Sequence, residues 1–205
     1  MAVITITGEK GTGSWNMVRR LAQKLDYDYI GEELKREIAK ALKLSEGEVE
    51  VFRKASQSRL IRKMDRYTCS LVQKVVDRER GCLDDREFHE TTVKLINKLY
   101  EDGNLIFHNW GAQCILKDRP HTVHVLVRRD REKKIEDAMA TYDLGFTAAR
   151  KLVVDDERDM QQYLKQFFDA DIDDAGLYDL IIDIDATGPD RAVSMVVDHI
   201  GQTGD

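Results

Sequence analysis

The sequence predicts an α/β domain in which helices cover both faces of a parallel sheet. Three observations support this fold class. Short apolar runs rich in β-branched residues alternate with longer amphipathic segments, as in a buried parallel sheet with helical crossovers. A glycine-rich turn at residues 8–13 separates the first run from the first amphipathic segment. The chain has 205 residues, of which 42% are hydrophobic, enough for one packed domain.

In the first half of the chain, Val3–Thr7 is short and β-branched, which predicts a buried strand, and Tyr27–Ile30 predicts a second short one. The other segments carry apolar residues at helical spacing. These predicted helices cover Asn16–Leu25, Glu32–Leu42, a segment opened by the capping box of Ser45 and Glu48, Ser56–Arg80 and Arg86–Tyr100.

The second half of the chain adds three predicted strands and three predicted helices. The strands are Asn104–His108, His121–Val127 and Leu177–Ile184. Asp130 is placed to cap a helix over Arg131–Thr141, and Thr147 to cap a long helix that ends near Phe168. Gly188-Pro189 opens a closing helix, because proline suits the first helical turn. Ligands of such sheets bind beyond the carboxyl ends of the strands, so we expect the site among the loops that follow them.

Composition narrows the classes of partner. The net charge of −6 arises from 38 acidic and 32 basic side chains, and this acidic excess argues against a general nucleic-acid binder. Cys69, Cys82 and Cys114 are far apart and form no C-x-x-C pair, which predicts free thiols in a reducing compartment. No apolar run has the length of a membrane span, and the N-terminus has no signal-peptide pattern. We therefore expect a cytoplasmic protein with no membrane association.

The loop after the first strand is the main functional signal. It comprises Gly8, Glu9, Lys10, Gly11, Thr12, Gly13, Ser14 and Trp15. A glycine loop between a strand and a helix directs backbone N–H groups and the positive end of a helix dipole at one spot, where a phosphate can bind. The alternative interpretation is a plain tight turn between a strand and a helix.

The spacing Gly8-x-x-x-x-Gly13 matches the front of a P-loop, G-x-x-x-x-G-K-S/T, but the back differs. Ser14 stands at the lysine position and Trp15 at the position of the Mg²⁺-binding hydroxyl. Lys10 could supply a cation from within the loop. The Ser14 hydroxyl, one position early, is our candidate metal ligand.

Five segments, in order, resemble the cytidylate kinase-like family of P-loop nucleoside-monophosphate kinases, and together they span almost the whole chain. They are the opening Ile4–Gly13, the short strand and following helix at Leu25–Leu34, Leu105–Ala112, the lid-like Asp155–Asp159, and Leu177–Asp183. The segment Leu105–Ala112 lies where the family carries a "GRG" motif. Here Asn109 replaces the first glycine of that motif, and Trp110 replaces its arginine.

The resemblance implies a three-layer P-loop fold, with a five-stranded parallel sheet in the order 2-3-1-4-5, in a single domain over residues 1–205. A helical insertion on the acceptor side would cover about 32–100, and a lid region about 142–175. The implied activity is phosphoryl transfer from ATP, with Mg²⁺, to a nucleoside monophosphate or a related small phosphate-bearing acceptor.

Phosphoryl transfer depends on positioned cations more than on covalent chemistry. The candidates are Lys10 in the loop, Arg36 after the second strand, and Arg150 with Arg158 on the lid helix. We assign Lys10, Arg150 and Arg158 to catalysis. The alternative for each arginine is a solvated surface residue.

Acceptor binding is assigned to four residues, Arg36, His108, Asn109 and Trp110. Trp110 cannot make the bidentate phosphate contact of an arginine, although it could stack on a base or pack at the sheet edge.

Three hypotheses on function therefore stand. The first is an enzyme, a small-molecule kinase. The second is a kinase-derived module that binds a nucleotide or an anion and has a regulatory or protein-interaction role, which the departures at Ser14, Trp15 and Trp110 favour. The third is a structural role, with Ser56–Arg80 as the surface of a homodimer.

Overall fold

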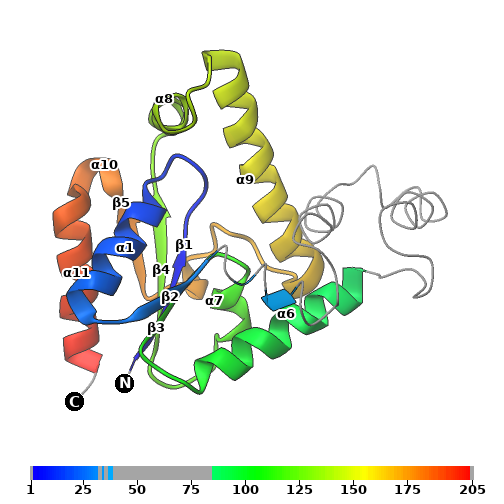
Figure 1. Ribbon diagram of the computed structural model, residues 1–205, viewed down its shortest axis with the longest axis vertical. Helices are drawn as coiled ribbons and strands as arrows, with labels where there is room; N and C mark the ends of the chain where they lie inside the picture. Colours follow the sequence, from blue (N-terminus) through cyan, green and yellow to red (C-terminus); the bar gives the residue numbers. More distant parts are fainter. Residues whose placement is uncertain (1, 32–33, 35–36, 39–84, 204–205) are drawn as a thin grey trace.

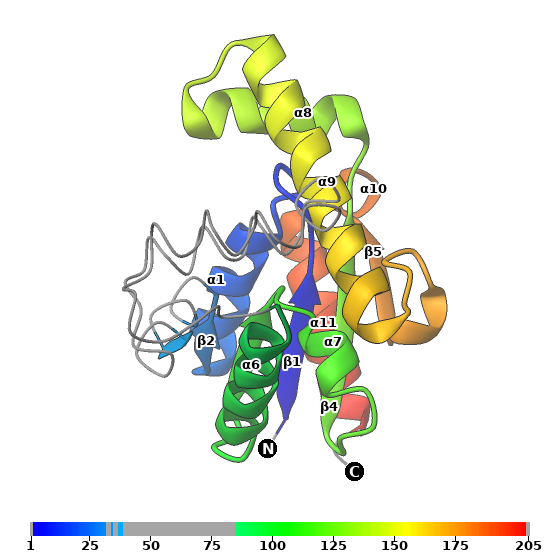
Figure 2. The same ribbon diagram turned by 90° about the vertical axis from the view of Figure 1, so that its right-hand side faces the viewer.

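Five parallel strands form the sheet that the sequence predicts. The computed structural model describes residues 2–31, 34, 37–38 and 85–203. The strands are β1 (Val3–Thr7), β2 (Asp28–Ile30), β3 (Leu105–His108), β4 (Thr122–Arg128) and β5 (Leu180–Asp183). Their order in the sheet is β2-β3-β1-β4-β5 (Figures 1 and 2). The fold class and the strand order are thus confirmed.

Helices cover both faces of this sheet (Figure 1). They are α1 (Ser14–Leu25), α6 (Asp85–Tyr100), α7 (Ala112–Ile115), α8 (Arg131–Tyr142), α9 (Phe146–Phe168), α10 (Ile184–Thr187) and α11 (Pro189–Thr203), with a 3-10 turn at Ala175–Leu177. The two helices α8 and α9 extend beyond the carboxyl ends of the strands, next to the loop that follows β1.

Alternating residues of β1 serve two separate hydrophobic cores, because successive side chains of a strand point to opposite faces. Ile4 and Ile6 are fully buried and pack in one core with the apolar side of α1 and with α11. Val3 belongs to the other core, which includes Phe88 of α6. A strand covered on both faces is buried along its whole length, as Val3–Thr7 is.

Three element boundaries differ from the predictions by more than one residue, each for a local reason. Helix α1 begins at Ser14 rather than Asn16, because the left-handed Gly13 ends the loop directly before it. Thr147 does not cap α9, since the extended Gly145 occupies that position. Strand β5 begins at Leu180 rather than Leu177, because the Asp174 side chain accepts from the Gly176 N–H and opens a 3-10 turn. The predicted cap of α8 is confirmed: Asp130 accepts from the Glu132 N–H at 2.9 Å.

Several predictions concern residues outside the described part of the chain. They are the helices within 39–84, the candidate Arg36, the thiols of Cys69 and Cys82, and the dimer surface at Ser56–Arg80. Cys114 is a free thiol, and burial raises its pKa to about 11, so it is protonated at neutral pH.

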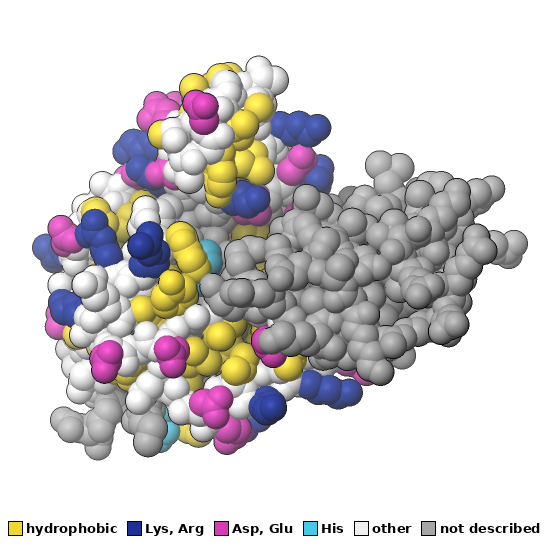
Figure 3. All heavy atoms as spheres, in the orientation of Figure 1, with side chains coloured by type: hydrophobic (Ala, Val, Ile, Leu, Met, Phe, Trp, Pro, Cys, Tyr) yellow, Lys and Arg dark blue, Asp and Glu magenta, His cyan; other side chains and the backbone are white. Residues whose placement is uncertain are grey.

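None of the described helices combines the length and the apolar character needed to cross a membrane. On the face shown in Figure 3, basic and acidic side chains of the described residues are interspersed, without a broad patch of one sign.

A buried ion network fastens the β1–α1 loop to α8 and α9. The Lys134 ammonium lies 2.5 Å from Glu9 Oε2 and 2.7 Å from Glu157 Oε1, and its side chain is 8% exposed. Arg131 binds the second oxygen of Glu157 at 2.7 Å. One cation from α8 thus joins a carboxylate of the loop to a carboxylate of α9.

The network shifts the pKa of each member in a direction that its surroundings explain. Burial raises the pKa of Glu9 and outweighs the pull of Lys134. Burial alone would lower the pKa of Lys134, but the hydrogen bonds to Glu157 and Glu9 raise it. Burial alone would raise the pKa of Glu157, but Arg131 and Lys134 together lower it. The shifts of Lys134 and Glu157 favour their charged forms, whereas the shift of Glu9 favours its neutral form.

We expect Lys134→Met to destabilise the chain by about 3 kcal/mol at neutral pH, because two buried carboxylates lose their shared cation. Urea unfolding measures this loss. The loss should shrink as the pH falls below 4.5, the ordinary value for Glu. The lowered pKa of Glu157 stabilises the native chain above that value, and this contribution disappears as the pH falls through the folded-state pKa.

Lys133→Met is the matched control for this prediction. Lys133 is the neighbouring residue on α8, its side chain is 52% exposed, and it lies 3.6 Å from Asp185. An exposed pair contributes at most about 1 kcal/mol. Equal losses from the two substitutions would show that burial of Lys134 does not govern the stability of this region.

Candidate nucleotide-binding site

The predicted phosphate loop lies at the carboxyl end of β1, the central strand of the sheet. Gly11 and Gly13 adopt left-handed backbone conformations, with φ of 83° and 78°, which suit glycine. A Cβ added at Gly11 would meet the Lys134 carbonyl oxygen at 2.2 Å. The loop therefore packs directly against the first turn of α8, and glycine is required at this contact.

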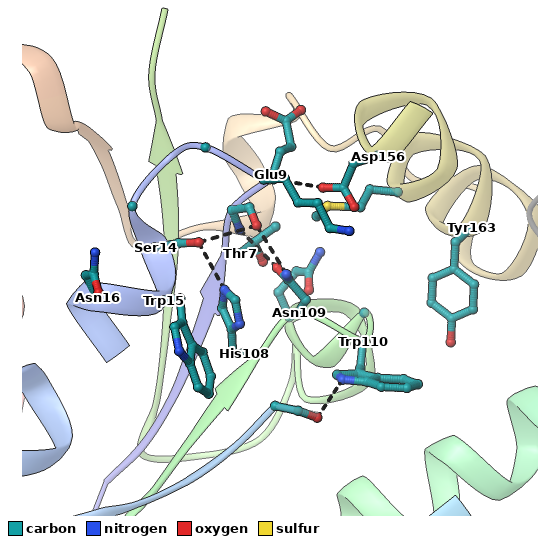
Figure 4. Close-up of a pocket in the computed structure, with 18 of the residues that line it drawn as sticks. Thr7, Glu9, Ser14, Trp15, Asn16, His108, Asn109, Trp110, Asp156 and Tyr163 are labelled. Carbon is teal, nitrogen blue, oxygen red and sulfur yellow. Dashed lines mark hydrogen bonds between the residues drawn. The ribbon is translucent and has the colours of Figure 1, made fainter. Parts of the chain in front are cut away.

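Asn109 holds the start of the loop in place. Its Oδ1 accepts from the Gly8 N–H at 3.0 Å, and its Nδ2 donates to the Gly8 carbonyl at 3.1 Å (Figure 4). Asn109, Trp110 and Gly111 have φ of 66°, 62° and 71°, so the chain turns sharply after β3. Asn109 was predicted as an acceptor-binding residue, and in the structure both the oxygen and the nitrogen of its side-chain amide bond the loop backbone.

Ser14, at the usual lysine position, is 3% exposed. Its Oγ lies 3.0 Å from His108 Nε2, accepts from the Thr12 hydroxyl at 3.1 Å and donates to the Gly8 carbonyl at 3.4 Å. Three protein partners already surround this hydroxyl, and one of them is a nitrogen. The site therefore fits a structural hydroxyl that closes the loop better than the oxygen ligand that Mg²⁺ prefers.

Trp15 lies where a P-loop carries its metal-binding hydroxyl. Its ring packs edge-on against Tyr29 at 5.4 Å and lies 5.3 Å from the His108 ring. A Cβ added to Gly31 would meet the Trp15 ring at 2.8 Å. Trp15 and His108 thus form an aromatic cover over the ends of β2 and β3, beside the loop (Figure 4).

A carboxylate of α9 accepts a hydrogen bond from one backbone amide of the loop. Asp156 Oδ2 accepts from the Lys10 N–H at 2.8 Å (Figure 4), the kind of contact that a phosphate oxygen makes with a glycine loop. Two more loop amides have internal partners: the Thr12 N–H donates to the Glu9 carbonyl at 3.2 Å, and the Ser14 N–H to the Thr12 hydroxyl at 3.4 Å. The loop is thus shaped for an anion and partly satisfied by the protein.

The loop opens into a cavity of about 380 Å³. Ten of the predicted site residues line it: Gly8, Glu9, Lys10, Gly11, Gly13, Ser14, Trp15, His108, Asn109 and Trp110. Thr12, the remaining residue of the loop, is fully buried and is not among the residues that line the cavity. The structure thus brings together the predicted loop and the segment after β3, which are about a hundred positions apart in the sequence.

Arg150 and Arg158, the arginines predicted to act from a lid, lie on α9 and are not among the described residues that line the cavity. Arg158 is 55% exposed and pairs with Asp155 at 3.0 Å and Asp159 at 3.2 Å. Arg150 is exposed near the start of α9. Their assignment to catalysis remains a prediction, and it requires α9 to move or rotate.

Sequence reasoning missed several cavity residues that lie outside the loop motif. They are Phe88, Gln113, Asp137, Thr141, Tyr142, Met160, Tyr163 and Leu164. These residues come from α6, α7, α8 and α9, and only the tertiary packing brings them together. The helical spacing of Met160 and Leu164 marks a buried face in the sequence, but it cannot distinguish a core from a ligand cavity.

Comparisons with solved structures identify the same fold. An uncharacterized protein from Eubacterium ventriosum superposes with a TM-score of 0.70 at 17% identity, covering 98% of this chain and 99% of that one. Shikimate kinase from Bacteroides thetaiotaomicron gives 0.56 at 12% identity, covering 98% of both chains. Shikimate kinase from Acinetobacter baumannii, solved in complex with shikimate, gives 0.52 at 11%, covering 98% and 94%. Among curated proteins, none matches the chain in sequence.

The family itself follows from the sequence. The model of the cytidylate kinase-like family matches residues 3–186, a span that includes the loop, the five strands of the sheet and helix α9. The chain belongs to the cytidylate kinase-like family.

Proposed function

We propose that the protein transfers a phosphoryl group from ATP to a small acceptor, a nucleoside monophosphate or a related molecule. One observation carries the proposal: the loop at the carboxyl end of the central strand opens into a cavity whose far wall is the lid helix α9. Such an arrangement can hold a donor phosphate at the loop and an acceptor beside it, which is the positioning that phosphoryl transfer needs.

The loop amides and the start of α1 would bind the phosphates of ATP, since helix N-termini favour anions. Lys10 lines the cavity and would supply the cation that Ser14 cannot. Mg²⁺ would arrive with ATP and offset the charge of the phosphates. The described residues include no cluster of three or more acidic, histidine or cysteine side chains that could hold a metal, so triphosphate oxygens would supply most of its ligands.

A second function is an anion- or nucleotide-binding module without transfer. The contact between Asp156 and the Lys10 N–H favours it, because a carboxylate at this position competes with a phosphate. Ser14, held by three partners, favours it as well. Under this alternative, the Asp156 carboxylate of the lid helix takes the position at the loop that a substrate phosphate would otherwise occupy.

We expect Lys10→Ala to lower the rate of ADP formation roughly a hundredfold, because it removes the cation nearest the transferring phosphate. The assay contains the purified chain, ATP, Mg²⁺ and a panel of nucleoside monophosphates and other small acceptors. Lys24→Ala, at the exposed end of α1, is the control and should leave the rate unchanged.

Nucleotide binding by calorimetry completes this test. Tight ATP binding without ADP formation would overturn the transfer function and leave the binding module. No ATP binding at all would overturn both. Normal turnover by Lys10→Ala would refute the role of Lys10 while leaving the activity in place.

Asp156→Asn should tighten the binding of ATP and pyrophosphate roughly tenfold, because the neutral amide no longer repels a phosphate at the Lys10 N–H. Asp159→Asn removes the same charge from the same helix at a residue that pairs with Arg158, and it is the matched control. Equal gains in affinity from both variants would show that the effect comes from the overall charge of α9 and not from the contact of Asp156 with the loop. No gain from either would show that Asp156 does not compete with phosphate.

A further inference from the structure

The two tryptophans of the chain differ in what their rings contact. The Trp15 ring packs against the rings of Tyr29 and His108. Trp110 is half-buried and lines the cavity, and its ring pairs with no other aromatic ring among the described residues. The part of the Trp110 ring that faces the cavity is thus left uncovered by aromatic neighbours.

Three contacts fix the Trp110 ring. Its Nε1–H donates to the Gly31 carbonyl at 2.9 Å (Figure 4). The left-handed backbone of residues 109–111 sets the direction of the side chain, and the ring packs against the core that includes Phe88. A side chain held in place before a ligand arrives loses little freedom on binding. Because the single polar atom of the indole is already engaged, Trp110 offers a ligand its ring surface and not a hydrogen bond.

The wall of the cavity next to Trp110 is held in place as well. The following residue, Gly111, packs on α9, where an added Cβ would meet the rings of Tyr163 and Phe168 at 2.9 Å. Tyr163 is 8% exposed, and its hydroxyl lies 3.3 Å from His89 Nδ1. The His89 ring in turn lies edge-on to Phe168, with the ring centres 5.1 Å apart. This aromatic cluster keeps Tyr163 against the turn that carries Trp110.

A space in the cavity lies between these two walls. Figure 4 shows the Trp110 indole nearly edge-on, with one face turned toward the space that separates Asn109 from Tyr163. Met160 and Leu164 line the same cavity from the side of α9 that carries Tyr163. A planar aromatic ring can cover an indole face with all of its ring atoms, whereas a puckered ring touches it with only some of them. The position therefore favours a planar ring.

We propose that Trp110 is a specificity-determining residue of the acceptor site and that a planar aromatic ring of the acceptor stacks on its cavity face. The inference rests on the proposed function, since it concerns the acceptor of that transfer. The class comprises nucleosides, their monophosphates and other small heterocycles, and it leaves out ring polyols. Where the family motif carries an arginine, this chain recognises a ring in place of a charge.

The test uses two single-tryptophan variants, Trp15→Phe and Trp110→Phe, each of which leaves one indole as the fluorophore. The probes are the four ribonucleosides, their 5′-monophosphates and myo-inositol. Inorganic tripolyphosphate with Mg²⁺ is added to fill the loop, so that a monophosphate does not bind there through its phosphate. At least one base-bearing probe should quench the emission of Trp110 in the Trp15→Phe variant to saturation. The Trp110→Phe variant should show a much smaller change.

Trp110→Leu should weaken binding of that probe about tenfold, measured by calorimetry, because leucine has no flat ring on which a base can stack. Trp110→Phe keeps a ring and should recover most of the loss. Tyr100→Leu is the matched control: Tyr100 packs against the same core as Trp110 but is not among the described residues that line the cavity, so the affinity should stay unchanged. The quenching experiment leaves Trp110 in place and therefore does not depend on how well Trp110→Leu folds.

Binding of myo-inositol without binding of any base-bearing probe would overturn the proposal, and so would the absence of binding by every probe. A base-bearing probe that binds without quenching Trp110, equal quenching in the two single-tryptophan variants, or equal losses in Trp110→Leu and Tyr100→Leu would contradict it too. Quenching confined to Trp110, without ADP formation when ATP replaces tripolyphosphate, would support the ring site and contradict the transfer function alone. ADP formation that requires an acceptor without an aromatic ring would support the transfer and contradict the ring site.

Discussion

The buried ammonium of Lys134 is the contact on which the arrangement of the site depends. It joins Glu9 of the loop to Glu157 of α9, and the backbone beside it leaves no room for a side chain at Gly11. Because one cation satisfies carboxylates from two elements, the loop and α9 cannot move independently at low energetic cost. Any opening of the cavity on this side has to break or transfer one of these bonds.

The sequence predicted the fold well because local patterns determine it. Val3–Thr7, followed by glycines and then by apolar residues at helical spacing, defines a strand, a turn and a helix without reference to any other part of the chain. The strand order came from the resemblance to a family, whose segments matched in sequence and in order. The larger errors, at the start of α1, at Thr147 and at the start of β5, lie where one turn residue decides a boundary.

The site was only partly predictable. The loop residues were found because glycine spacing is readable in sequence, whereas the roles of Ser14 and Asn109 were not. The sequence predicts Ser14 as a metal-binding hydroxyl. Its contacts with His108 and Gly8 arise only when distant parts of the chain pack together. In the sequence, Asn109 is only a replacement of the first glycine of the family motif. In the structure, its side-chain amide forms two hydrogen bonds with the backbone of Gly8. Gln113 lines the cavity but belongs to no sequence motif, so only the tertiary packing identifies it.

The left-handed turn at residues 109–111 limits how this segment can vary. Position 109 needs a residue that tolerates positive φ and also offers one donor and one acceptor to the Gly8 backbone. Asparagine meets both conditions, whereas glycine meets the first alone and glutamine is too long for the same geometry. In a saturation library across these three positions, we therefore expect few folded variants with substitutions at 109 or 111. At 111, an added Cβ would meet Tyr163 and Phe168 at 2.9 Å. Position 110 shares the positive φ, but its side chain lines the cavity and takes no part in the clamp on Gly8. It is therefore the place in this turn where a substitution changes the cavity wall while the start of the loop stays held.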